Sequence, residues 1–322
     1  MPRPNFFIVG APKCGTTALH RFLGRHSQVF VTTPKEPHYF APDLPGYRDV
    51  TSREAYEQLF APAAPNQWRL GEASVFYLYS REAAQRIRRY APQARIVALV
   101  RNPLDLLPSF HSQLLYSRDE DEPELSRAWQ LIAQRRHGQR IPRHCRAPQL
   151  LRYDRFARLG EQLERWYEAF SPEQIHVLFF EDLVSNASTE LARLLSFLKL
   201  PDEGPRELEH VNTRRAHRWS WLADFTQRTP QPLVDAALAF KQVAGIKRLG
   251  VLDALRRWNE TRPLQAPLET WLQEAIADCY AEDVARLGRL TGRNLSHWLD
   301  PQRLVPPRRV GEDSQELAAA AV

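Results

Sequence analysis

The chain has 322 residues, enough for one large α/β domain or two small ones and for a substantial buried core. Hydrophobic residues make up 43% of the chain and recur throughout it, which excludes global disorder. Lysine and arginine total 44 against 38 aspartate and glutamate residues, and the net charge of +6 suits a small anionic cofactor as well as a polyanion, so nucleic acid is not implied as a partner.

The cysteines and the apolar segments bear on the cellular compartment. Cys14, Cys145 and Cys279 are widely separated, lack metal-ligand spacing and cannot all pair, which fits a reducing compartment. No N-terminal stretch is apolar enough for a signal peptide, and no window approaches the ~20 apolar residues of a membrane span. We therefore expect a cytoplasmic protein without a membrane span, whose oligomeric state the sequence leaves open.

Residues 5–23 are expected to form a strand, a tight loop and a helix. The apolar run over residues 6–9 predicts a buried parallel strand, Gly10 a sharp turn, and the period from Gly15 onward a helix. A helix that begins directly after a buried strand leaves backbone N–H groups unpaired and carries roughly half a positive charge at its start. This unit is therefore a candidate anion-binding site.

The loop fits the Walker A pattern G-x-x-x-x-G-K-[ST] only in part. Gly10, Gly15 and Thr17 match it, but Thr16 stands in the place of the lysine, and the loop's only lysine, Lys13, lies between the glycines. This shift favours a phosphate-like ligand held without the usual nucleoside-triphosphate and magnesium geometry. An ordinary strand-to-helix turn with a capping threonine is the alternative interpretation.

A short strand over residues 28–33 leads into the segment PKEPHYF at residues 34–40. Its two prolines exclude a helix, so Lys35, Glu36 and His38 should lie on an extended, irregular segment close to a strand end. Ligands of open α/β sheets bind at the carboxyl ends of the strands. These side chains are therefore candidate site residues, although a Lys–Glu pair on an exposed loop is commonly only solvated charge.

The next expected elements are a helix over residues 52–60, a strand into Glu72 and Ser74, and a helix over residues 80–91 capped by Ser80. The run over residues 94–100 is continuous in apolar residues, as in a central parallel strand.

That strand ends in Arg101, where a magnesium-dependent enzyme of the P-loop class would normally place an acid. Arg101 instead indicates recognition of a second anionic group by charge-assisted hydrogen bonds. Pro103 fits the first position of the following helix, and Ser109 lies two turns further on.

The alternation of helix and strand continues to residue 198. Residues 118–124 are expected to be a solvated acidic run, and the segment 135–152, with six arginines, either faces an anionic substrate or is solvated surface. A helix is expected over residues 156–170, a strand over 175–180 and a helix over 188–198. Because no break in composition occurs, we predict a single α/β domain with a doubly wound parallel sheet flanked by helices.

Beyond residue 201, residues 210–219 are expected to form a loop rich in His and Arg, a composition suited to binding a phosphate group. Helices are expected around 232–241 and over 268–290. The expected core stripe of the last helix is Trp271, Leu272, Ile276, Tyr280, Val284 and Leu287. From residue 300 the tail is polar and finally Ala-rich, and we expect it to be mobile.

Three of these segments together resemble the sulfotransferases that use 3′-phosphoadenosine 5′-phosphosulfate (PAPS), especially the carbohydrate and bacterial types. PKCGTT at residues 12–17 resembles their 5′-phosphosulfate loop, KEPHYF at 35–40 resembles K-E-x-H-[FY]-F, and R-N-P-x-x-x-x-x-S at 101–109 resembles their 3′-phosphate element. The resemblance covers residue 5 to about residue 299. It implies a P-loop-like sulfotransferase domain over residues 1–299, followed by the tail at 300–322.

The resemblance also implies roles for individual residues. Glu36 would be the general base, Lys13 would neutralise charge on the leaving phosphate, and His38 would orient Glu36 or the acceptor. The implied cofactor contacts are Lys13, Cys14, Gly15, Thr16, Thr17, Ala18, Arg101, Ser109, Thr213, Arg214 and Arg215. No metal is required.

The chain departs from the family pattern in three places. Ala73 and Val75 replace the lysine and proline of E-K-T-P-x-Y, Leu106 replaces a further arginine, and the loop at 213–217 lacks the lysine and glycine of K-G-R-x-H. We interpret the chain as an enzyme that transfers a sulfonate group from PAPS to an acceptor hydroxyl of a carbohydrate or small metabolite. An ATP-dependent small-molecule kinase and a non-catalytic nucleotide-binding module are the alternatives, and O- or N-sulfation is left open.

Overall fold

The structure, a computed structural model, describes residues 2–204, 207–208, 216–217, 260–261 and 267–300. Thr213, Arg214 and Arg215, the helix expected around residues 232–241 and the tail beyond residue 300 lie outside the described residues.

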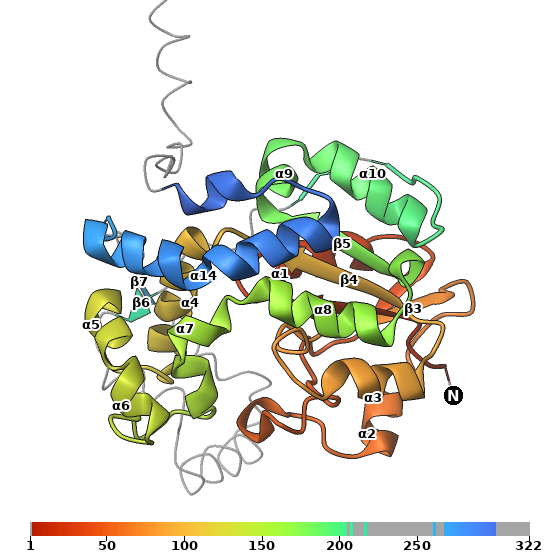
Figure 1. The fold of residues 1–322 in the computed structure, drawn as a ribbon. Coiled ribbons are helices and arrows are strands. Elements are labelled where there is room, and N and C mark those ends of the chain that lie inside the picture. The colour runs from red at the N-terminus through yellow and green to blue at the C-terminus, as the bar shows by residue number, and fades with distance from the viewer. Residues whose placement is uncertain (1, 205–206, 209–215, 218–259, 262–266, 301–322) are drawn as a thin grey trace, which may run out of the picture.

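One parallel sheet of five strands, in the order β2-β3-β1-β4-β5, forms the centre of the fold (Figure 1). The strands are β1 (Phe6–Gly10), β2 (Val29–Val31), β3 (Arg69–Ala73), β4 (Arg95–Val100) and β5 (Ile175–Phe179). β1 and β3 are buried along their whole length, because helices cover both faces of the sheet. The predicted α/β fold with a parallel sheet flanked by helices is confirmed.

Helices connect the strands and cover the sheet. The α-helices are α1 (Thr16–Gly24), α2 (Arg53–Gln58), α3 (Ala83–Tyr90), α4 (Pro103–Ser117), α5 (Leu125–Gln130), α6 (Ile132–Arg136), α7 (Tyr153–Phe156), α8 (Leu159–Ala169), α9 (Phe180–Ser185), α10 (Ala187–Phe197) and α14 (Thr270–Thr291). The 3₁₀ helices are η1 (Pro45–Tyr47), η2 (Pro148–Leu151), η3 (Pro172–Gln174) and η4 (Ser296–Leu299). In Figure 1, α8 and α14 pack against each other in front of the sheet, and α1 lies behind it.

A second, antiparallel sheet consists of the two-residue strands β6 (Ala216–His217) and β7 (Glu260–Thr261). The sequence did not predict this pair.

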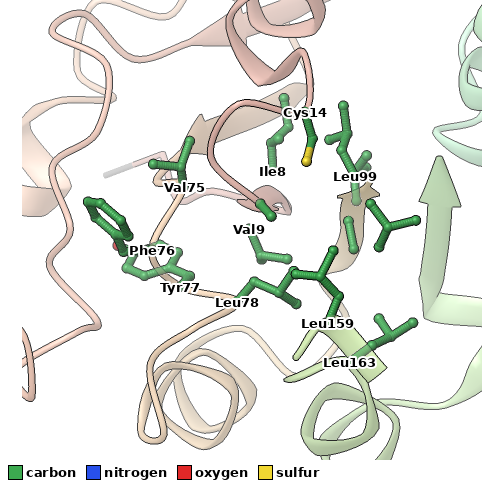
Figure 2. Packing of buried hydrophobic residues seen from close by; sticks show 14 of the residues in the cluster. Ile8, Val9, Cys14, Val75, Phe76, Tyr77, Leu78, Leu99, Leu159 and Leu163 are labelled. Atoms are coloured by element: carbon green, nitrogen blue, oxygen red, sulfur yellow. The ribbon is translucent and has the colours of Figure 1, made fainter. Parts of the chain in front are cut away.

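The core joins β1 to the helix in front of the sheet. Figure 2 shows a cluster formed by Val9 of β1, Leu78 of the loop after β3, and Leu159 and Leu163 of α8. Val9, Leu78 and Leu163 are fully buried. Burial of this kind contributes roughly 1.5–3 kcal/mol per large aliphatic side chain. The core therefore holds β1 in place, the strand that leads into the loop of residues 10–15, which we call the phosphate loop.

Several predicted boundaries shift by a few residues. The helix expected over 156–170 divides into α7 and α8, and the helix expected from Ser80 begins at Ala83. Ser80 Oγ nevertheless accepts hydrogen bonds from the backbone N–H groups of Glu82 and Ala83, at 3.2 and 3.1 Å. The hydroxyl therefore satisfies the donors that a helix start leaves unpaired, as its sequence position suggested.

The prediction for Trp271 was wrong. Its side chain is 38% exposed, whereas Leu272, Ile276 and Tyr280 of the same helix are buried. Residues 272, 276 and 280 follow each other at four-residue intervals on one face of α14, and Trp271 is turned away from that face by about 100°, the rotation per residue of a helix.

The prediction of a solvated acidic run over residues 118–124 was also wrong at its centre. Asp119 and Glu120 are each only 1% exposed. Glu120 forms a bidentate ion pair with Arg135, with both distances 2.7 Å, and both side chains are fully buried. Asp119 forms a bidentate pair with Arg146, whose side chain is 40% exposed. Two arginines of the segment 135–152 therefore neutralise the acidic run, because a charge is removed from water only when a partner compensates it.

Removing the Arg135 guanidinium should strongly destabilise the fold. Arg135→Met leaves the Glu120 carboxylate buried without its cation, and we expect the free energy of unfolding to fall by about 3–5 kcal/mol in chemical denaturation. Arg127→Met is the matched control, because the ion pair of Arg127 with Glu124 is exposed and should contribute little. Replacing both buried partners, as Arg135→Met with Glu120→Leu, should recover much of the loss. Equal effects of Arg135→Met and Arg127→Met would contradict the assignment.

Candidate functional site

A cavity of about 400 Å³ brings together all three predicted catalytic residues, Lys13, Glu36 and His38. We call it the site cavity. Its lining residues are Pro12, Lys13, Thr16, Thr17, Lys35, Glu36, His38, Tyr47, Asp49, Val75, Phe76, Phe110, Gln113, Leu114, Ser117 and Arg146. Most of them come from the loops after β1, β2 and β3, from the start of α1 and from α4, and Arg146 comes from the segment between α6 and η2. The cavity thus lies where ligands bind in open α/β sheets.

The loop after β1 has the backbone of a phosphate-binding turn. Gly10 has a φ of 135°, and a Cβ atom there would lie 2.3 Å from the carbonyl oxygen of Val75, so only glycine fits. Gly15 has a φ of 92° and forms the N-cap of α1, which receives no capping hydrogen bond from a described side chain. The first N–H groups of α1 are therefore available to an anion.

Cys14 and Thr16 have different surroundings in this loop. Burial raises the pKa of the Cys14 thiol to about 12, and its side chain faces Ile8 and Leu99 in the core (Figure 2). The Cys14 side chain is thus a packing group, and only its backbone faces the loop interior. The side chains of Thr16 and Thr17 line the site cavity, whereas Ala18 does not.

Arg101 lies directly behind the phosphate loop. Its Nη1 atom donates to the backbone oxygen of Lys13 at 3.1 Å, and its guanidinium lies 4.3 Å from the centre of the Phe180 ring. Its Nε atom is buried and has no hydrogen-bond partner among the described residues. Arg101 and Ser109 do not line the site cavity, and Ser109 is buried on α4.

Lys13 and Glu36 both line the cavity, and each has polar neighbours. Lys13 Nζ lies 3.3 Å from Oε1 of Gln113, and Glu36 forms an ion pair with Lys35. Nε2 of His38 lies 3.9 Å from Oε2 of Glu36. Burial lowers the pKa of His38, so the imidazole is neutral at neutral pH. Its Nε2 atom is buried and has no hydrogen-bond partner within the described part of the chain, so the Glu36 carboxylate lies close to an unsatisfied ring nitrogen.

Three predicted catalytic residues have left-handed backbone conformations. The φ angles of Lys13, Glu36 and His38 are 65°, 70° and 49°. Such conformations cost of order 1–3 kcal/mol for residues other than glycine, and they persist only where surrounding contacts fix the backbone. Contacts elsewhere in the chain must therefore hold the backbone of these three residues in conformations that they would not adopt by themselves.

Glu72 at the end of β3 provides those contacts for the segment that carries Glu36 and His38. It is fully buried and accepts hydrogen bonds from Tyr56, Tyr77 and Ser74, at 2.8, 2.8 and 2.6 Å. The Ser74 hydroxyl in turn accepts the backbone N–H of His38 at 3.0 Å. One buried carboxylate thus positions the segment through a serine relay.

A second buried carboxylate, Asp119, fixes another part of the cavity wall. Asp119 accepts hydrogen bonds from Tyr47 at 2.8 Å and from Arg146 at 2.6 Å, and the Arg146 guanidinium lies 4.0 Å from the centre of the Tyr47 ring. Burial alone would raise the pKa of Asp119, but the hydrogen bonds from Arg146 and Ser117 outweigh it and lower the pKa. The carboxylate is therefore ionised, and Tyr47 and Arg146 are held together at the cavity.

Several cavity residues were missed at the level of sequence. Gln113 follows Ser109 by one helical turn, so the i, i+4 spacing on α4 is a signal that could have found it. Tyr47, Phe76 and Phe110 give no comparable signal, because aromatic residues in such a chain are usually core. Arg146 belongs to the segment 135–152, and it alone of that segment lines the site cavity.

Within the described ranges, no group of three or more His, Cys, Asp or Glu side chains could hold a metal ion. None of the helices in these ranges is long and apolar enough to cross a membrane.

Comparisons with known proteins agree on one family. The family model described as "Sulfotransferase domain" matches residues 3–218. The chain is 26% identical over 249 residues to carbohydrate sulfotransferase 15 of Mus musculus, covering 61% of this chain and 44% of that protein. It is 28% identical over 201 residues to heparan sulfate glucosamine 3-O-sulfotransferase 3B1 of Homo sapiens, covering 61% and 46%. The chain thus spans about half the length of the curated relatives that it matches.

Among solved structures, the crystal structure of a sulfotransferase from Alicyclobacillus acidocaldarius is similar over almost the whole chain. It matches with a TM-score of 0.65 and 25% identity, covering 93% of this chain and all of that one.

Stability should reveal the burial of Glu72 through its pH dependence. Burial raises the pKa of Glu72 from 4.5 to about 7, so between these values the folded chain keeps a proton that the unfolded chain loses. The stability associated with this group is therefore present below pH 4.5 and is lost as the pH rises towards 7. Relative to Glu72→Gln, the wild type should lose roughly 3 kcal/mol over this interval, at about 1.4 kcal/mol per pKa unit.

The measurement is urea unfolding at a series of pH values for both proteins. Glu54→Gln, a change at an exposed glutamate of α2, is the matched control and should follow the wild-type curve. Parallel curves for wild type and Glu72→Gln would mean that Glu72 is ionised over the whole range.

Proposed function

The chain belongs to the sulfotransferase domain family, and from this membership and the site geometry we propose that it transfers a sulfonate group from PAPS to a hydroxyl group of an acceptor. The observation that carries the proposal is the meeting of the phosphate loop and the Glu36 segment in one cavity. A nucleotide-binding module without catalytic activity would need only the phosphate loop.

The residues around the phosphate loop suit both the 5′-phosphosulfate and the 3′-phosphate of PAPS. The uncapped start of α1, with Gly15 to Ala18, suits the 5′-phosphosulfate through backbone N–H groups. The buried, unpaired Nε of Arg101 suits a second phosphate, because a desolvated guanidinium donor without a partner is costly and an oxyanion would complete it. We assign the 3′-phosphate to Arg101 and Ser109. Thr213, Arg214 and Arg215 remain proposed contacts of the same nucleotide.

When bound, PAPS would supply an activated sulfonate group whose leaving group is a phosphate. Lys13 lines the cavity next to the loop and would neutralise the charge that develops on the bridging oxygen. Glu36 would accept the proton of the acceptor hydroxyl as the new O–S bond forms, since a carboxylate is too weak a base to remove it beforehand. The neutral His38, 3.9 Å away, would orient that carboxylate.

The acceptor would enter between Glu36 and the aromatic wall. Tyr47, Phe76 and Phe110 line the cavity beside Arg146. Aromatic faces of this kind pack against the apolar face of a sugar ring or another compact ring system. We therefore propose a carbohydrate or ring-containing small metabolite as the acceptor.

The cofactor assignment makes a prediction for Arg101. Arg101→Ala should weaken binding of 3′-phosphoadenosine 5′-phosphate by about 2–4 kcal/mol in isothermal titration, the range for losing a buried charged partner. Binding of adenosine 5′-phosphate, which lacks the 3′-phosphate, should barely change. Equal losses for the two nucleotides would refute the assignment, and tighter binding of ATP than of either would favour a kinase.

The role of Glu36 as the proposed base gives a prediction that tests the function directly. Wild-type protein should transfer label from PAPS to an acceptor of a hydroxyl panel, and Glu36→Gln should lower kcat by about 10²–10⁴-fold, because it keeps the shape but loses the basic oxygen. Affinity for 3′-phosphoadenosine 5′-phosphate should stay unchanged. The control Glu54→Gln should retain full activity. A Glu36→Gln variant with near-normal kcat would show that the base lies elsewhere.

A further inference from the structure

A second cavity, of about 390 Å³, lies outside the site cavity and is lined by five arginines. We call it the arginine cavity. Its cationic side chains are Arg81, Arg152, Arg155, Arg158 and Arg165. They come from the loop before α3, from α7 and the residues that flank it, and from α8. Neither the phosphate loop nor any residue proposed for sulfonate transfer lines it.

The carboxylates near this cavity do not balance its charge. Only Asp43 and Glu161 line it, against five arginines. Asp43 is already engaged with the loop before α3, because its two oxygens accept hydrogen bonds from Ser80 Oγ at 2.6 Å and from the backbone N–H of Arg81 at 2.9 Å. Glu161 lies 3.6 Å from Arg165 and compensates one guanidinium at most. The cavity therefore keeps a clear excess of positive charge.

The arginines differ in how they are held. Arg152 pairs with Asp154 at 3.1 Å, and Arg158 donates to the backbone oxygen of Asp154. Arg81 and Arg155 are exposed and have no ion pair within the described residues. Arg152 and Arg158 are thus fixed in position, whereas the side chains of Arg81 and Arg155 are able to adjust. An oxyanion site needs both, fixed donors to orient the anion and movable ones to complete its hydrogen bonds.

Arg165 forms the floor of the cavity. Its Nη atoms donate to the backbone oxygens of Leu78, Tyr79 and Glu161, at 3.1 to 3.3 Å, so the guanidinium is fixed in position. Its Nε atom is buried and finds no partner in the described part of the chain. Burial lowers the pKa of Arg165, and the nearby charge of Arg81 also lowers it. A buried donor without an acceptor is a cost that a bound oxyanion would remove.

We propose that the arginine cavity binds a phosphate or sulfate group, either as a free anion or as an ester on a small ligand. Planar guanidinium groups match the oxygens of tetrahedral oxyanions in bidentate fashion, and several of them desolvate such an anion without a metal ion. The cavity shares two chain segments with the site cavity: Asp43 and Tyr47 lie on one, and Arg146 and Arg152 on the other. Gln149 joins these segments by donating to the backbone oxygen of Asp43 at 2.9 Å.

The test uses the full chain and isothermal titration with inorganic phosphate, inorganic sulfate and glucose 6-phosphate, with glucose as the uncharged probe. The variant is Arg81→Gln combined with Arg155→Gln, because both side chains are exposed and unpaired and their loss should not disturb the fold. The matched control is Arg89→Gln combined with Arg143→Gln, two exposed arginines outside both cavities that remove the same charge. Thermal unfolding of both double variants checks that they fold.

The expected result is a binding event that the first double variant weakens by about tenfold or more, as for the loss of two charge-assisted hydrogen bonds, while the control changes it less than about twofold. Tighter binding of glucose 6-phosphate than of inorganic phosphate identifies an ester ligand, and equal binding identifies the free anion. Affinity for 3′-phosphoadenosine 5′-phosphate should be the same in all three proteins. Equal losses in the two double variants, or no binding beyond that at the phosphate loop, would overturn the proposal.

Discussion

The geometry of the site depends on one buried carboxylate, Glu72. It lies one residue before the end of β3, next to the strand that carries the phosphate loop, and three hydroxyl groups donate to it. Through Ser74 and Tyr77 it holds the backbone N–H groups of His38 and Phe40, at 3.0 and 3.2 Å. These hydrogen bonds help to hold the left-handed conformations of Glu36 and His38, which cost free energy in residues other than glycine.

The order of the strands explains why distant segments meet. β1 lies at the centre of the sheet between β3 and β4, so the loops that follow these strands emerge side by side at one edge. The loop after β1 brings Lys13, the loop after β3 brings Val75 and Phe76, and the helix after β4 brings Gln113. The segment after β2 completes the cavity, and its backbone is bound to Ser74 and Tyr77, the two hydroxyl residues that donate to Glu72 from the loop after β3.

Local sequence patterns predicted the strands and the turn that form the site, but they did not predict the long-range ion pairs. The buried strands and the turn at Gly10 follow from short runs of sequence, and the structure contains them. Asp119 and Glu120 were predicted to be solvated, and both are buried. Their partners lie 27 and 15 residues away in a segment without regular periodicity, so nothing in the acidic run indicates that it is buried. Sequence alone also gave no means to separate the arginines that pair with these acids from those that line the arginine cavity.

The two buried carboxylates beside the site cavity differ in their chemistry, and this gives its two walls different properties. Glu72 is surrounded only by neutral hydroxyl donors, so burial dominates and raises its pKa to about 7. Asp119 binds the guanidinium of Arg146, whose hydrogen bonds outweigh burial and lower its pKa. The wall of Tyr47 and Arg146 therefore keeps its charges at all moderately acidic and neutral pH values. The anchor of the Glu36 segment instead changes its protonation near neutrality, so the two carboxylates respond differently to pH.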